Sequence, residues 1–123
     1  MLMRSVTLIA AALGLTLSGT AYAHPKLLSA SPAENAVVAK PARLQLQFSE
    51  QLVPAFSTAD LTMDAMPGMA AMKMASTAKV APDGRTLVIM PKSALPRGRY
   101  TVAWRVVSSD THRVNGTYSF SVK

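Results

Sequence analysis

The chain has 123 residues, with 13 Lys or Arg against 6 Asp or Glu, so its formal net charge is +7. This length corresponds to one domain, and an apolar fraction of 50% with 15% charged residues excludes an intrinsically disordered chain. The absence of cysteine excludes a disulfide scaffold, thiolate metal sites, iron–sulfur clusters and cysteine nucleophiles. The basic excess suggests at first a polyanionic partner, either nucleic acid or an anionic membrane.

Residues 1–23 predict a secretory signal peptide. Arg4 supplies a positive charge, residues 8–17 form a short apolar run, and Ala21-Tyr22-Ala23 is a small-x-small cleavage signal. The apolar run is too short for a membrane span, which needs about 20 residues. Cleavage after Ala23 would release residues 24–123 into a bacterial periplasm, which argues against nucleic acid as a partner. The scattered basic side chains are then interpreted as solubilising surface charge.

Cleavage would also change the chemistry of His24. As the first residue of the processed chain, His24 carries a free α-amine beside its imidazole. Those two nitrogens can chelate one metal ion in a small ring, whereas inside a longer chain the same backbone nitrogen is an amide. His24 is therefore a candidate metal ligand that needs partners elsewhere in the chain.

Short segments with period-2 alternation follow in chain order, and Pro- and Gly-containing turns separate them. The predicted strands are residues 26–31, 43–48, 61–63, 77–81, 86–90, 99–108 and 117–122. The side chains expected to face the core from the last two are Tyr100, Val102, Trp104, Val106, Tyr118, Phe120 and Val122. About seven short strands without a helical stripe predict an all-β, antiparallel Greek-key sandwich or small barrel, formed by one domain over residues 24–123.

Five methionines gather within twelve residues. They are Met63, Met66, Met69, Met72 and Met74. A helix would be broken by Pro67-Gly68, and the spacing does not alternate as in a strand, so the pattern predicts an exposed loop. Thioether sulfur is a soft ligand that selects Cu(I), and three or four such side chains can enclose one ion. The alternative is a sticky apolar surface for a partner.

The second histidine of the chain, His112, follows the longest predicted strand in an Asp110-x-His112 pair. In an extended backbone both side chains point to the same side. Together with His24 they would offer two imidazoles, one α-amine and one carboxylate, a donor set suited to tetragonal Cu(II). The alternative is an ordinary surface histidine at a strand end.

These residues lie in a chain that resembles the CopC/PcoC family of periplasmic copper-resistance proteins. The resemblance covers residues 24–123 and is carried by the methionine cluster and by these segments: His24-Pro-Lys-Leu, Ser31-Pro-Ala-Glu-Asn, Leu46-Gln-Phe-Ser-Glu50, Leu95-Pro-Arg-Gly-Arg-Tyr-Thr-Val and Trp104-Arg-Val-Val-Ser-Ser-Asp-Thr-His112. The resemblance implies a cupredoxin-like or immunoglobulin-like Greek-key barrel. It also implies a Cu(II) site at His24, Asp110 and His112 with the N-terminal amine, and a Cu(I) site in the methionine loop at the opposite end.

We expect a monomeric periplasmic carrier that passes copper to a partner. The resemblance implies that this partner is a membrane copper transporter or another periplasmic copper protein. One departure matters: family members with two copper sites often have a histidine in the methionine loop, and this loop has none. Cu(I) would then be held by thioethers alone, and which methionines serve is open. Glu50 matches a glutamate near the family's Cu(II) site, and it is open whether it is a ligand, a hydrogen-bond acceptor for a ligand or a surface charge.

Two other functions are considered. An N-terminal histidine also chelates copper in polysaccharide-cleaving monooxygenases, but these need an open equatorial position for oxygen, which Asp110 could close. A plain adhesion module of the sandwich type would bind no metal. The sequence favours a carrier that is not an enzyme.

Overall fold

The structure is a computed structural model that describes Gly14 and residues 24–123. The predicted signal peptide, apart from Gly14, lies outside the described residues. Within the described part of the chain, no helix is long and apolar enough to cross a membrane.

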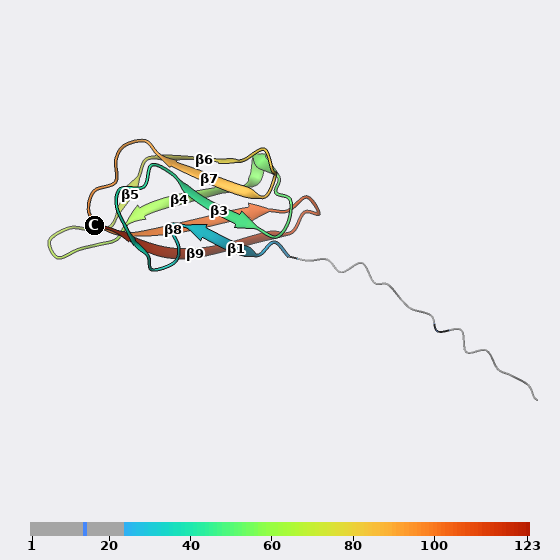
Figure 1. The fold of residues 1–123 in the computed structure, drawn as a ribbon, viewed down its shortest axis with the longest axis horizontal. Coiled ribbons are helices and arrows are strands. Elements are labelled where there is room, and N and C mark those ends of the chain that lie inside the picture. The colour runs from blue at the N-terminus through green and yellow to red at the C-terminus, as the bar shows by residue number, and fades with distance from the viewer. Residues whose placement is uncertain (1–13, 15–23) are drawn as a thin grey trace, which may run out of the picture.

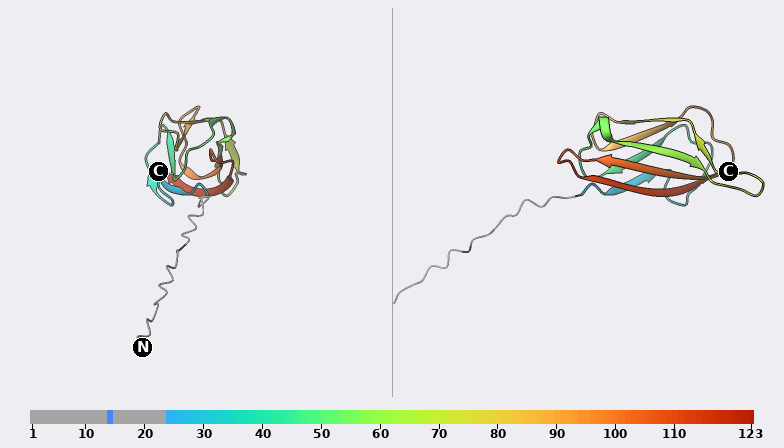
Figure 2. Two further views of the ribbon diagram at one scale, coloured as in Figure 1. Left: turned by 90° about the vertical axis from the view of Figure 1, so that its right-hand side faces the viewer. Right: turned by 180° about the vertical axis from the view of Figure 1, so that it is seen from behind.

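Residues 24–123 fold into two β-sheets that pack face to face, as the end-on view in Figure 2 shows. One sheet contains, in spatial order, β1 (Leu27–Ser31), β3 (Leu44–Phe48), β7 (Thr86–Pro91) and β6 (Ser76–Val80). The other contains β2 (Val37–Val38), β9 (Arg113–Val122), β8 (Gly98–Val107), β4 (Thr58–Met63) and β5 (Met72–Met74). A short 3₁₀ helix, η1 (Pro54–Phe56), lies between β3 and β4 (Figure 1). The chain crosses repeatedly from one sheet to the other, so the predicted all-β sandwich is confirmed.

Neighbouring strands pair antiparallel, as expected, with one difference at a sheet edge. β2 runs parallel to the end of β9, with Val37 opposite Ser121 and Val38 opposite Val122. The longest pairing joins β8 to β9, from Gly98 opposite Val122 to Val107 opposite Arg113. The β8–β9 hairpin therefore extends along the sandwich from one end of the molecule to the other.

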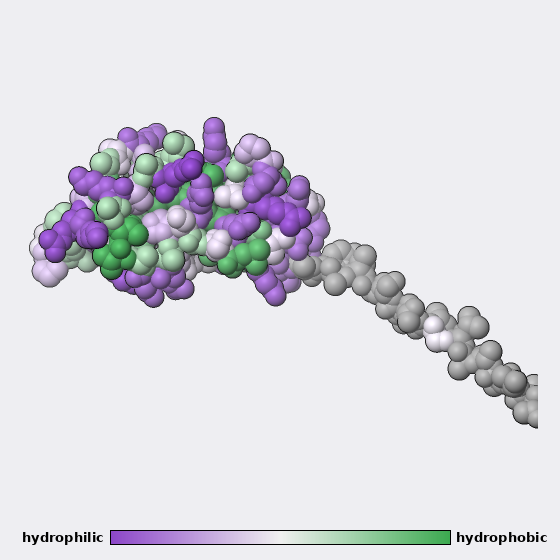
Figure 3. All heavy atoms as spheres, in the orientation of Figure 1, coloured by the Kyte–Doolittle hydropathy of each residue, from purple (hydrophilic) through white to green (hydrophobic). Residues whose placement is uncertain are grey.

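The core lies between the two sheets and contains the side chains that alternation assigns to it. All seven side chains predicted to face inward from the last two strands are buried, and so are Leu44, Leu46 and Phe48 of β3. Phe48 meets Trp104 edge to face, with ring centroids 5.1 Å apart. On the outside, Figure 3 shows a mostly hydrophilic face with small apolar patches.

Tyr100 fixes the turn that leads into β8. Its hydroxyl donates a hydrogen bond of 2.6 Å to the carbonyl oxygen of Pro96, four residues earlier, in the manner of a tyrosine corner. The predicted turn at residues 95–98 is therefore tied to the core by a buried ring.

Several strand features differ from the predictions, and one of them is the start of β4, which lies at Thr58 rather than at residue 61. β2 has two residues, too few for alternation to be visible. β5 pairs with β4, although its three residues lie within the segment predicted to be a loop. β9 begins at Arg113 rather than at residue 117, because the Asn115-Gly116 pair is part of the strand and not a turn.

Candidate metal centre

The two histidines of the chain meet at one end of the sandwich. The ring centroids of His24 and His112 are 4.6 Å apart, and the rings are inclined by 51°. Pro25 is fully buried directly after His24. The Lys26 amide donates a hydrogen bond of 2.9 Å to Ser49 Oγ, and the Lys26 carbonyl accepts one of 2.9 Å from the Ser49 amide. These contacts hold the start of the folded domain in place beside His112.

The connection between β8 and β9 positions the aspartate. Thr111 has a left-handed backbone with φ of 72°, a conformation that reverses the chain direction at some cost for a residue with a side chain. The amide of Thr111 donates to the Ser108 carbonyl at 2.8 Å, and the amide of Ser108 donates to the His112 carbonyl at 2.9 Å. The result brings Asp110 Oδ2 to 3.1 Å from His112 Nδ1.

Ser108 is a member of this cluster that the sequence did not single out. It is buried, and its hydroxyl donates a hydrogen bond to Asp110 Oδ1. That hydrogen bond, helped by the nearby His112 imidazole, lowers the pKa of the Asp110 carboxyl. The alternation of the strand could have indicated that Ser108 is buried, because Ser108 continues the inward-facing positions of β8 one step beyond Val106. The hydrogen bond from Ser108 thus favours the carboxylate, which is the form that a metal ion needs.

The predicted Cu(II) ligands lie next to one another in pairs, but together they do not form a complete coordination site. His24 lies beside His112, and His112 lies beside Asp110. Among the described residues, no three His, Asp or Glu side chains are grouped so as to hold one ion. In the unprocessed chain the nitrogen of His24 is also part of the peptide bond to Ala23. The fourth donor of the predicted set would exist only after cleavage.

Glu50 lies on the segment next to this end. It is half-buried and follows β3 after one intervening residue, Ser49. The next residue, Gln51, accepts a hydrogen bond of 2.9 Å through its carbonyl from the amide of Ser109. The backbone that carries Glu50 is thus bonded to the connection that carries Asp110, and its role in metal binding stays a prediction.

The methionine cluster lies on a hairpin formed by β4 and β5. Met63 is opposite Met72, and Met66 is opposite Met69 with backbone hydrogen bonds of 2.9 and 2.8 Å in both directions. Pro67 and Gly68 make the turn, with Gly68 at φ of 81°, a conformation that favours glycine. Figure 1 shows this hairpin projecting beyond the body of the sandwich near the C-terminus.

The prediction that all five methionines lie in a water-exposed loop is wrong. Met63 is 6% exposed and belongs to the core, because it faces inward from β4 against Gly98, where a Cβ would lie 2.8 Å from Met63 Cε. Met66 and Met74 are half-buried and pack against the core. Met69 and Met72 are 47% and 50% exposed. The five methionines therefore range from buried in the core to about half exposed to solvent.

The histidine cluster and the methionine hairpin lie at opposite ends of the molecule (Figures 1 and 2). β8 connects them, since its first residues lie beside the hairpin, where the amide of Asp64 donates to the Arg99 carbonyl, and its last residue precedes Ser108. A strand of 10 residues at about 3.4 Å per residue spans roughly 30 Å. Two ions bound at these ends would not share ligands.

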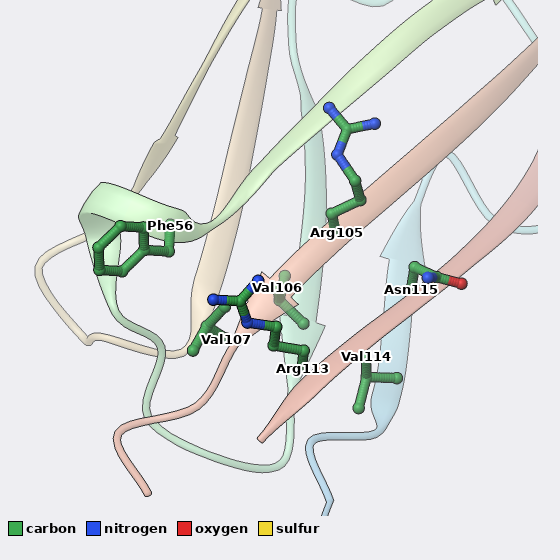
Figure 4. Close-up of a pocket in the computed structure, with 7 residues that line it drawn as sticks. All are labelled: Phe56, Arg105, Val106, Val107, Arg113, Val114 and Asn115. Atoms are coloured by element: carbon green, nitrogen blue, oxygen red, sulfur yellow. The ribbon is translucent and has the colours of Figure 1, made fainter. Parts of the chain in front are cut away.

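A hollow lies on the outer surface beside the histidine end, and Figure 4 shows the residues that line it: Phe56, Arg105, Val106, Val107, Arg113, Val114 and Asn115. It contains none of the predicted metal ligands. Phe56, on η1, is 66% exposed. The candidate metal ligands thus lie outside this hollow.

The fold and these two clusters define a class: a small β-sandwich with nitrogen and oxygen donors at one end and thioethers at the other. The chain belongs to the CopC family, whose CopC domain matches residues 27–123. It is 49% identical over 121 residues to "Copper resistance protein C" of Xanthomonas campestris pv. juglandis, covering 97% of this chain and 93% of that protein. It is 52% identical over 120 residues to the protein of the same name from Pseudomonas syringae pv. tomato, covering 96% and 94%. The crystal structure of PcoC, a methionine-rich copper resistance protein from Escherichia coli, superposes with a TM-score of 0.76 at 46% identity, covering 82% of this chain and 100% of that one.

Proposed function

We propose that this protein is a periplasmic copper carrier that serves copper resistance and is not an enzyme. The relatives named above are copper resistance proteins, which supports copper as the metal. In this proposal the processed chain holds Cu(II) at the histidine end and Cu(I) at the methionine hairpin. It delivers the ion through a transient contact with another copper protein, such as a membrane copper transporter.

The observation that carries the proposal is the contact between the His24 and His112 rings, 4.6 Å apart between centroids. These are the two histidines of the sequence, and they come from opposite ends of the domain. With the α-amine of His24 and the carboxylate of Asp110, they provide three nitrogens and one oxygen, which suits tetragonal Cu(II). In this proposal Asp110 and the freed terminus move onto one ion when the site closes.

The thioether site is assigned to the outer part of the hairpin. Met63 is committed to the core, so the remaining candidates for Cu(I) are Met66, Met69, Met72 and Met74. Met66 and Met69 face each other across the turn, and Met72 and Met74 lie on the neighbouring edge strand. Neutral thioethers on a projecting hairpin suit a soft ion that must be both bound and released.

The test of the Cu(II) site is a titration of two forms of the domain. One form begins at His24, and the other carries a single glycine before His24. We expect the added residue to weaken Cu(II) binding by orders of magnitude, because it converts the chelating amine into an amide, while the far-UV circular dichroism stays unchanged. The affinity is measured by competition with a Cu(II) chelator.

The matched control adds the glycine after Lys123, at the other terminus, where affinity for Cu(II) is expected to stay the same. Equal Cu(II) affinity of all three forms would show that the terminal amine is not a ligand and would remove the main support for the site as proposed.

A further inference from the structure

Two methionines of the hairpin, Met69 and Met72, are about half exposed, whereas the other three are buried or partly buried. We propose that Met69 and Met72 are oxidation sites, and that their conversion to sulfoxide by peroxide empties the hairpin of Cu(I) while leaving the Cu(II) end intact. This inference rests on the proposed Cu(I) function of the hairpin. It makes the hairpin a site that responds to two inputs, copper and oxidant.

Exposure separates the reactive methionines from the protected ones. Met69 and Met72 are 47% and 50% exposed, whereas Met63 is 6% exposed. Met66 and Met74 are partly covered by the core. Because peroxide must reach the sulfur atom directly, oxidation follows accessibility, and the order expected here is Met69 and Met72 first and Met63 last.

The backbone of the hairpin does not depend on the exposed sulfurs. Met66 and Met69 are joined by two hydrogen bonds between backbone atoms, and Met72 pairs with Met63 through the β4–β5 ladder. Adding an oxygen to an exposed side chain leaves these hydrogen bonds in place. The hairpin is therefore expected to keep its shape when it is oxidised, so that a change in copper binding reports on the ligands and not on unfolding.

Oxidation of a methionine to its sulfoxide needs hydrogen peroxide and no further reactant. Hydrogen peroxide transfers one oxygen atom to the thioether: its O–O bond breaks, an S–O bond forms, and water leaves. The sulfur loses two electrons and the peroxide gains them. The sulfoxide presents a polar oxygen where the soft sulfur donor stood, which Cu(I) disfavours as a ligand. The histidine end contains no thioether among its proposed donors, so its affinity for Cu(II) is expected to persist.

The sequence offers an internal control outside the hairpin. Met90 lies on β7 and is 48% exposed, the same as the reactive pair. It should be oxidised at a similar rate without any effect on Cu(I) binding. A Met90→Leu variant keeps apolar volume at that position and removes the control sulfur.

The experiment uses the domain that begins at His24, treated with hydrogen peroxide and mapped by peptide mass spectrometry. Oxygen is expected first on Met69, Met72 and Met90. In protein loaded with Ag(I), a soft ion that does not change oxidation state here, Met69 and Met72 are expected to be protected and Met90 to react as before. Equal protection of all three, or of none, would overturn the proposal.

Cu(I) affinity is then measured by competition with a chromogenic Cu(I) chelator, before and after oxidation, in the natural chain and in Met90→Leu. Both are expected to lose at least about tenfold in Cu(I) affinity, the lower end of the losses seen when the surroundings of a metal ligand are altered. Treatment with the two methionine sulfoxide reductases, one for each sulfoxide epimer, should restore it. Cu(II) affinity, measured in parallel, should not change.

The outcomes separate the two proposals. Absence of Cu(I) binding before oxidation would refute the Cu(I) hairpin and the oxidation switch together. Cu(I) binding that survives complete oxidation of Met69 and Met72 would overturn the switch alone. A loss that the reductases do not reverse, accompanied by altered circular dichroism, would show damage to the fold and would also overturn it.

Discussion

Gly116 faces Trp104 across the β8–β9 pair, and the indole ring occupies the space that a side chain at position 116 would need. A Cβ at this glycine would lie 2.8 Å from Trp104 Cε2 and closer still to Trp104 Cζ2. The ring is 7% exposed and is held edge to face against Phe48, so it has little freedom to move away. Because Gly116 has no side chain, the Trp104 ring can pack directly against the β9 backbone in the longest hairpin.

At this scale we predict that Gly116→Ala destabilises the domain by about 1–3 kcal/mol, the usual cost of overpacking a filled core. The measurement is urea unfolding followed by circular dichroism. In a Trp104→Phe background, which lacks the clashing indole atoms, the same substitution should cost less, since the pair is coupled through direct contact. An equal cost in both backgrounds would show that the indole is not the obstacle.

At the scale of elements, the β4–β5 hairpin joins a core strand to a solvent-exposed tip. Met63 anchors it in the core, while the turn of Pro67 and Gly68 lies outside the body of the sandwich. The histidine end is built differently, from three segments that are far apart in sequence. It follows that changes to the hairpin tip should act on one of the two proposed metal sites without reaching the other.

The prediction for this element is that replacing Met66, Met69 and Met72 together by leucine abolishes Cu(I) binding and spares Cu(II) binding. Leucine keeps the apolar volume and removes the sulfur donor, so the fold should persist. Titrations with each oxidation state, supported by circular dichroism, measure the two affinities. The control is Met90→Leu, with an exposed methionine on β7. Parallel loss of both affinities in the triple variant would indicate one shared site.

At the scale of the whole molecule, carboxylates tie neighbouring strands together. Asp60 on β4 accepts a hydrogen bond from Arg105 on β8 at 3.1 Å and forms an ion pair with Lys73 on β5 at 3.2 Å. In the turn between β6 and β7, Asp83 accepts hydrogen bonds from the Thr86 hydroxyl at 2.7 Å and from the Arg85 and Thr86 amides at 3.0 Å each. The Arg105 and Lys73 contacts lower the pKa of Asp60, and the Thr86 hydroxyl and nearby amides lower the pKa of Asp83.

Because both pKa values are lower in the folded than in the unfolded chain, these carboxylates stabilise the fold fully above the unfolded aspartate value of about 3.9, and this stabilisation is lost as the pH falls through the lowered values. We predict that the free energy of unfolding of the metal-free domain declines below pH 4. The decline should be shallower in Asp83→Ala, and also in Thr86→Val, which removes the hydroxyl with the largest effect on that carboxyl. Urea unfolding across pH 2–7 checks this. Identical pH profiles in all three proteins would show that Asp83 does not contribute.

Local patterns in the sequence predicted the strands whose alternation is clean. β3 and β8 bury every second side chain as expected, because one face of each strand is covered by the opposite sheet. The two edge strands of the five-stranded sheet were harder to predict: β2 is too short to show a period, and β5 carries apolar methionines where a solvated strand would normally be polar. Residues 113–116 were not assigned to a strand, because their place in β9 comes from pairing with residues 104–107 of β8.

The sequence by itself determined which ligand chemistry this protein has available. It contains no thiolate, two histidines and a cluster of thioethers, and a predicted cleavage that would free an amine at His24. Only the tertiary structure decided which of these groups are neighbours and which are exposed. His24 meets His112 because β1 pairs with β3, and the segment after β3 is bonded to the connection before His112. Met63 is withdrawn from the cluster because β4 turns it toward the core. Side-chain type and periodicity are local properties of the chain, whereas proximity and burial arise from the pairing of distant strands, which no local pattern records.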